Sequence, residues 1–190
     1  MNTTARAEAV SSGAAIAAHA ASQQAQQYLT FLLGGEVFAI GILAIKEIIE
    51  YDSLTGVPMM PECIRGVINL RGAVVPVMDL SARFGRPSTN VTKRTCIVIV
   101  EIETAGERHV VGAIVDAVNE VMEIPASAIE PPPRFGSRVN AEFIHGMGNL
   151  NGKFVVILDA DKLLSCEDLE SLSMATLTQE GPHAEATTGV

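Results

Sequence analysis

The fold of this 190-residue chain is decided by the stretch Ile64-Arg65-Gly66-Val67-Ile68-Asn69-Leu70-Arg71-Gly72, which returns later as Ile144-His145-Gly146-Met147-Gly148-Asn149-Leu150-Asn151-Gly152. Aligned without a gap, the two stretches share the Ile, two Gly, the Asn and the Leu, and the register continues through the matches Val75/Val155 and Asp79/Asp159. A second series keeps a constant register of its own and comprises Val37/Val110, Ala44/Ala117, Glu47/Glu120 and Pro58/Pro131. Two series of matches in the same order indicate a duplicated unit of about 70 residues.

Short apolar runs, rich in β-branched residues and separated by turn residues, extend on both sides of this stretch. They predict strands at residues 28–33, 37–40, 66–70, 73–78, 95–102, 108–115, 118–124, 144–150 and 154–158. Two-residue turns are expected at Gly34-Gly35, Arg71-Gly72 and Asn151-Gly152, because hairpin turns favour residues that tolerate a positive φ. Five or so short strands per unit are typical of a small all-β barrel or sandwich.

Three further segments carry local expectations. Residues 42–50 fit helical and strand spacing alike, and we expect a short helical turn followed by a strand. Another helical turn is expected at residues 81–85, and a C-terminal helix over residues 161–174. Pro76 lies inside a predicted strand and has no N–H to donate, so that side of the strand should be an edge or a bulge.

The composition bounds the class of protein. Hydrophobic residues make up 48% of the chain and the net charge is −9, which excludes a disordered or collagen-like chain and gives enough apolar residues for a packed core. The acidic balance argues against nucleic acid as a partner, since phosphate contacts need clustered Lys and Arg. No run reaches the roughly 18 apolar residues that a membrane span needs, so direct membrane insertion is not expected.

Residues that could carry chemistry are sparse. Three cysteines without Cys-x-x-Cys spacing favour neither a disulfide framework nor a metal site, and the chain has none of the common nucleotide-binding or hydrolase motifs. No cofactor and no catalytic residue are therefore predicted. An enzyme that pairs Cys63 or Cys96 with His109 or His145 is the alternative from this class.

Two other features stand out within the apolar pattern. Glycines interrupt strands at Gly66, Gly112 and elsewhere, where a strand must bend or pass another backbone closely. Arg71 breaks the internal symmetry, because its repeat partner is Asn151. On a plain surface an Arg71–Glu47 pair would add at most about 1 kcal/mol of stability. In a partner's groove the same pair could fix orientation and specificity.

The run from Ile64 to Leu80, together with residues 37–48, 108–116 and 143–164, resembles the CheW-like chemotaxis coupling family. The resemblance covers residues 27–166. It implies two SH3-like five-stranded β-barrels related by a pseudo-twofold, the first over residues 27–90 and the second over 91–166, with strand exchange between them possible. Residues 1–26 would then be a disordered leader, and residues 167–190 an acidic helix end and disordered tail.

For function, the resemblance implies a non-catalytic cytoplasmic scaffold in receptor arrays at the inner face of the membrane. Such a scaffold couples the cytoplasmic tips of methyl-accepting chemoreceptors to the regulatory domain of a CheA-like histidine kinase. The positions that match receptor-binding residues of the family are Ile45, Glu47, Gly66, Arg71, Gly112 and Val121. Ile42 matches an apolar contact to the kinase.

Two further alternatives remain open at this point. The chain could be a CheW-like adaptor of a pilus-motility pathway or of another receptor–kinase pathway. It could also be an exported ligand-binding barrel, if residues 1–26 were a signal peptide. That leader nevertheless carries Glu8 and interrupts its apolar stretch with Ser11, Ser12 and Gly13, unlike a Leu-rich signal sequence.

Overall fold

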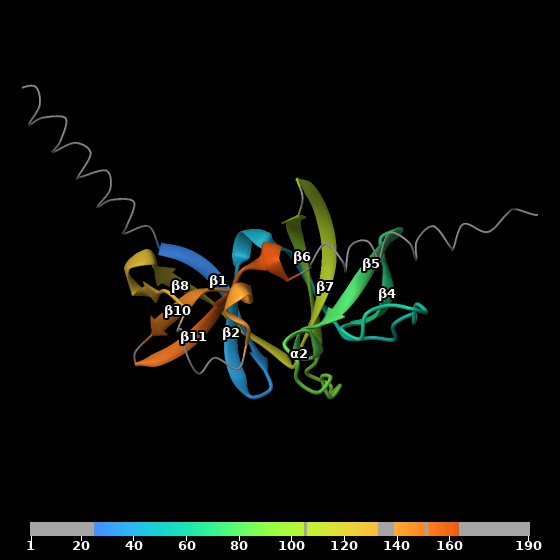
Figure 1. Ribbon diagram of the computed structural model, residues 1–190, viewed down its shortest axis with the longest axis horizontal. Coiled ribbons are helices and arrows are strands. Elements are labelled where there is room, and N and C mark those ends of the chain that lie inside the picture. The colour runs from blue at the N-terminus through green and yellow to red at the C-terminus, as the bar shows by residue number, and fades with distance from the viewer. Residues whose placement is uncertain (1–24, 105, 133–138, 151, 164–190) are drawn as a thin grey trace, which may run out of the picture.

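The computed structural model describes residues 25–104, 106–132, 139–150 and 152–163, and these residues form two curled β-sheets packed against each other (Figure 1). The strands are β1 (Ala25–Leu33), β2 (Glu36–Gly41), β3 (Ile45–Glu50), β4 (Ile64–Leu70), β5 (Ala73–Asp79), β6 (Cys96–Thr104), β7 (Glu107–Val115), β8 (Ala117–Pro125), β9 (Ile129–Glu130), β10 (Ile144–Leu150) and β11 (Lys153–Leu158). The short helical elements are η1 (Ile42–Ala44), α2 (Leu80–Arg83), η2 (Ala126–Ala128), η3 (Ala141–Phe143) and η4 (Ala160–Lys162). The predicted all-β fold is confirmed.

Each sheet curls until its two edges meet. One sheet has the order β3-β6-β7-β5-β4, and a backbone bridge between Thr55, which follows β3, and Val67 of β4 joins its edges. The other has the order β8-β1-β2-β11-β10-β9. There the chain continues from β8 through η2 into the two-residue β9, which pairs with β10. Both sheets are therefore small barrels, and few strand edges are left open.

The two barrels take their strands from both halves of the sequence. Strands β1 and β2 pair with β8 and β11, whereas β3, β4 and β5 belong to the sheet of β6 and β7. The two barrels therefore exchange strands between the halves of the sequence, as the expectation allowed, and the division between the sheets does not fall at residue 90. A barrel built from residues 27–90 alone would lack β7, which pairs with β5, and β11, which pairs with β2.

Alternation along the strands separates three cores. In β6, Val98, Val100 and Ile102 point into a large core that both sheets share, while Ile97 and Ile99 point into the interior of their own barrel. In the other sheet, Phe38 and Ile40 join the shared core, and Ala39 faces its barrel's interior. Because strand side chains alternate with a period of two, one apolar run serves two cores at once.

Strand pairing confirms the duplication. The pairs Ile64↔Met78 and Gly66↔Val77, with a bulge between them, have counterparts in the second repeat in Ile144↔Leu158 and Gly146↔Ile157, again with a bulge. The parallel pair Val77↔Gly112 likewise corresponds to Ile157↔Ala39. Each repeat therefore contributes the same hairpin and the same parallel contact to its barrel.

The local expectations have mixed outcomes. Residues 42–50 form η1 followed by β3, and the turn expected at residues 81–85 is α2, whose N-terminus is capped by Asp79. Pro76 is not on an edge strand, because β5 lies between β4 and β7. Pairing with β7 begins at Val77, however, so Pro76 has a ladder partner only in β4. Most of the helix expected at residues 161–174 lies outside the described residues.

Candidate protein-binding site

The β4–β5 hairpin presents Arg71 at its tip. The loop has two residues, and Arg71 and Gly72 have φ values of 53° and 92°. Two positive φ values are what a type I′ turn requires, and this turn matches the twist of the flanking strands. Glycine adopts such a φ freely, but an arginine there is held by its surroundings.

The Arg71 side chain pairs with Glu47 of β3. The Nη2 atom of Arg71 lies 2.9 Å from Oε2 of Glu47, and the Arg71 side chain is 80% exposed while that of Glu47 is 25% exposed. The pair joins β3 to the β4–β5 turn across the line where this barrel closes. A solvent-exposed ion pair of this kind contributes about 0–1 kcal/mol to stability. The other guanidinium donors of Arg71 are accessible to a partner protein.

The elements that lead to and contain Glu47, η1 and β3, also carry apolar side chains. Ile42 and Ile45 are partly buried against the shared core, whereas Leu43 is 99% exposed and Ile48 is 42% exposed. Sequence reasoning missed Leu43 and Ile48. Ile48 pairs with Val98 of β6 and so lies on the side of β3 that faces the shared core, and the sequence pattern alone predicts burial there instead of exposure. No sequence signal marks Leu43, because a lone leucine in a helical turn is ordinarily buried.

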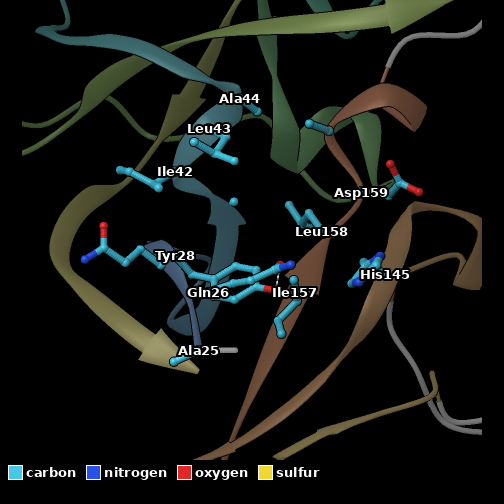
Figure 2. A pocket seen from close by; sticks show the side chains of 13 residues that line it. Ala25, Gln26, Tyr28, Ile42, Leu43, Ala44, His145, Ile157, Leu158 and Asp159 are labelled. Atoms are coloured by element: carbon cyan, nitrogen blue, oxygen red, sulfur yellow. Dashed lines mark hydrogen bonds between the residues drawn. The ribbon is translucent and has the colours of Figure 1, made fainter. Parts of the chain in front are cut away.

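An apolar hollow of about 540 Å³ adjoins η1 (Figure 2). Tyr28, Ile157 and Leu158 lie in its middle, between Ile42 and Leu43 on one side and His145 and Asp159 on the other. The Tyr28 hydroxyl donates a hydrogen bond to Oε1 of Gln26 (2.9 Å), and burial raises the pKa of this phenol. The hollow thus extends the exposed apolar surface of η1 onto the barrel that contains β1, β10 and β11.

Gly66 and Gly112 lie in the barrel that carries β3, on β4 and β7. A Cβ atom on Gly66 would collide with the carbonyl oxygen of Thr55, and one on Gly112 would stand 2.7 Å from Cγ2 of Ile97. Both glycines are buried. They can therefore affect a partner only through the shape of the barrel: Gly66 at the bridge that closes it, and Gly112 in its interior.

Val121 stands on the other barrel. It lies on β8, opposite Leu29, and is 48% exposed. In the register that matches Glu47 with Glu120, Val121 corresponds to Ile48, so the two barrels expose an apolar side chain at equivalent positions of equivalent edge strands. The structure therefore joins Glu47 and Arg71 directly and places Ile42 and Ile45 on adjacent elements, but it puts Val121 in a different sheet.

Charged side chains tie β3 to its neighbours. The Nζ atom of Lys46 lies 2.6 Å from Oε2 of Glu101 on β6, and Nη1 of Arg108 on β7 lies 3.7 Å from Oε1 of the same carboxylate. The hydrogen bond from Lys46, helped by both positive charges, lowers the pKa of Glu101. These exposed pairs link β3 to β6 and β7 but contribute little to stability.

Two observations concern groups that could hold a metal or react with a substrate. Among residues 25–163, with the stated gaps, no three His, Cys, Asp or Glu side chains are grouped so that they could hold a metal ion. Cys63 is buried in the shared core, and Sγ of Cys96 donates to the backbone carbonyl of Arg94 (3.3 Å). No helix in the described part of the chain is long and apolar enough to cross a membrane.

Fold and surface together define a class: two fused β-barrels that expose apolar side chains and an ion pair on their surface. A family model described as the CheW-like domain matches residues 27–168. This chain therefore belongs to the CheW family of chemotaxis scaffold proteins.

Relatives and a solved structure agree with this assignment. Chemotaxis protein CheW of Klebsiella aerogenes is 36% identical over 144 residues, covering 76% of this chain and 84% of the relative. Protein FrzA of Myxococcus xanthus is 29% identical over 152 residues, covering 79% and 91%. The crystal structure of the scaffolding protein TtCheW from Thermoanaerobacter tengcongensis superimposes with a TM-score of 0.68 at 34% identity, covering 76% of this chain and 91% of that chain.

Proposed function

We propose that this chain couples methyl-accepting chemoreceptors to a CheA-like histidine kinase and makes or breaks no bond itself. The observation that carries the proposal is the exposed Arg71–Glu47 pair, together with the exposed apolar side chains of Leu43 on η1 and Ile48 on β3. A helical receptor tip offers apolar ridges, which such side chains can bury, while the charges at the rim select the register.

We assign receptor contacts to Ile45, Glu47, Arg71 and Val121, with Gly66 and Gly112 keeping the barrel in shape behind them. Ile42 is assigned to the regulatory domain of the kinase, at the hollow that adjoins η1. A scaffold with separate contacts to two partners gains by multivalency, because several weak contacts add up to a stable assembly. The chain would then act in receptor arrays at the cytoplasmic face of the membrane.

Arg71→Ala should separate binding from stability. Loss of a buried or partner-contacting arginine commonly costs more than about 1 kcal/mol, so affinity for the receptor fragment or the kinase should fall about fivefold or more. Unfolding should shift by less than about 4 °C, because the lost ion pair is exposed. Titration calorimetry and thermal denaturation measure the two quantities.

Arg108→Ala is the matched control, since Arg108 is also an exposed arginine paired with a glutamate on the same barrel. It should change neither quantity appreciably. A large loss of stability in Arg71→Ala with normal affinity would contradict the assigned role.

Reconstitution tests the function itself. The chain is mixed with the CheA-like kinase of its own organism and a cytoplasmic receptor fragment, and kinase autophosphorylation is compared with and without it. Receptor-dependent stimulation is expected only when the chain is present. The similarity to FrzA makes a related receptor–kinase pathway the second candidate. Capture of a non-chemotaxis kinase in place of the CheA-like one would favour that candidate.

A further inference from the structure

The β4–β5 turn has a second polar contact beneath the arginine. Oδ1 of Asn69 accepts a hydrogen bond from the backbone N–H of Gly72, with a distance of 2.8 Å. Asn69 is exposed and has no core to fill, so this contact is what its side chain contributes. An asparagine that accepts from a backbone N–H three residues on closes the turn locally.

The contact matters because of the backbone at Arg71. A non-glycine residue at a φ of 53° persists only where its surroundings hold it there. The strand pair Leu70↔Ala73 closes the two-residue loop at its base, and the Asn69–Gly72 hydrogen bond ties the loop itself to β4. Together they direct the Arg71 side chain across the closure of the barrel toward Glu47.

We infer that Asn69 is a positioning residue for partner binding, acting through Arg71; this inference rests on the proposed function. By holding the turn, Asn69 keeps the guanidinium next to Glu47 before a partner arrives. A side chain that is already ordered loses less conformational entropy when the complex forms. Without the Asn69 contact, the turn and Arg71 would sample other orientations, and the partner would have to order them.

The second repeat supplies the matched control. Oδ1 of Asn149 accepts from the N–H of Gly152 at 3.3 Å, which is the equivalent contact in that repeat. That turn carries Asn151-Gly152 in the sequence, a pair that adopts positive φ values readily, and it has no arginine. Removing Asn149 therefore tests the loss of the hydrogen bond without the loss of a positioned arginine.

The experiment compares Asn69→Ala, Asn149→Ala, Arg71→Ala and the double variant Asn69→Ala/Arg71→Ala in the full chain. The probes are the purified CheA-like kinase and a receptor cytoplasmic fragment, and both affinity and urea unfolding are measured. Asn69→Ala and Asn149→Ala should lose similar stability. Only Asn69→Ala should bind more weakly, by roughly two- to tenfold, the range expected for one net hydrogen bond.

The double variant and a conservative variant show whether Asn69 acts through Arg71. In the Arg71→Ala background, Asn69→Ala should weaken binding no further, because no arginine is left to position. Asn69→Asp keeps an oxygen that accepts from Gly72 and should bind within about twofold of the parent chain.

Equal effects of Asn69→Ala and Asn149→Ala on affinity would overturn the inference, as would additive effects in the double variant. Failure of the proposed function looks different. In that case Arg71→Ala itself would leave both affinities unchanged.

Discussion

Gly66 and Gly112 have no side chains to offer a partner, yet each occupies a place that no other residue fits. Gly66 has a φ of 150°, and its Cα faces the backbone of Thr55 at the bridge that closes the barrel. Gly112 faces the side chains of Ile97 and Val77 inside the barrel. The sequence predicts close approach at these glycines from their place in apolar runs, but not which neighbour approaches.

Gly66→Ala and Gly112→Ala should each destabilise the chain by about 1–3 kcal/mol, because the added methyl group must displace packed atoms. The cost at Gly66 should be the larger, since a backbone carbonyl cannot move aside as a side chain can. Gly41→Ala is the control, because its Cβ would meet nothing within 4 Å. Chemical denaturation measures all three, and a neutral Gly66→Ala would disprove the close approach.

How far the site can be predicted also depends on individual residues. The Arg71–Glu47 pair is predictable because Arg71 departs from its repeat partner at a hairpin tip. The exposure of Leu43 is not, since exposure depends on whether another element covers η1, and sequence spacing carries no such information. Val121 is assigned by resemblance, and its equivalence to Ile48 becomes visible only through the strand pairing.

At the scale of elements, one buried carboxylate organises the segment that leads from the first repeat to the second. Asp79 ends β5 and is fully buried. Its carboxylate accepts from the N–H groups of Ser81 and Ala82 at the start of α2, and from both the N–H and the hydroxyl of Thr89. Arg65 of β4 adds an ion pair at 3.2 Å. Strand, helix and connecting loop thus share one acceptor.

Asp79→Ala should cost about 3–5 kcal/mol, because it leaves buried donors and the Arg65 cation without their partner. Asp159, the equivalent residue of the second repeat, gives the control. Asp159 is partly exposed and pairs with Lys162, itself 58% exposed, so Asp159→Ala should cost at most about 1 kcal/mol. Equilibrium unfolding in urea measures both losses. Equal losses would show that burial of the Asp79 carboxylate is not what matters.

Element boundaries are predictable where turn chemistry and strand alternation agree, as in the β10–β11 hairpin around Asn151-Gly152. The place of a strand in the sheet is less predictable when it is inferred from a single residue. Pro76 suggests an edge strand, yet β5 has neighbours on both sides and only the ladder to β7 begins late, at Val77. The missing N–H of a proline removes a hydrogen bond at a single position of the ladder. It therefore does not show whether the whole strand lies at the edge or in the middle of the sheet.

At the scale of the whole molecule, the two barrels are one structural unit. A series of aromatic rings, Phe31–Phe38–Phe84–Phe143, runs through the shared core with centroid separations of 6.2, 6.0 and 5.5 Å. Phe38 belongs to one sheet, whereas Phe84 follows α2 at the end of the other sheet's β5. The repeat in the sequence suggests two consecutive modules. Matching residues reveal duplication, but they do not show which copy of a strand completes which barrel.

Dividing the chain at residue 90 should therefore leave neither half folded. The fragment of residues 1–90 would hold β1 and β2 without β8 and β11, and β3 to β5 without β6 and β7. Each barrel would lose at least two of its strands, and the shared core would be exposed to water. Circular dichroism and amide NMR dispersion should show unfolded fragments, whereas the intact chain should unfold in one cooperative transition.

Mixing the two fragments should restore part of the native signal, because every missing strand is present in the other piece. Cooperative unfolding of either fragment alone would contradict this, since it would require a barrel that closes with the strands of a single half.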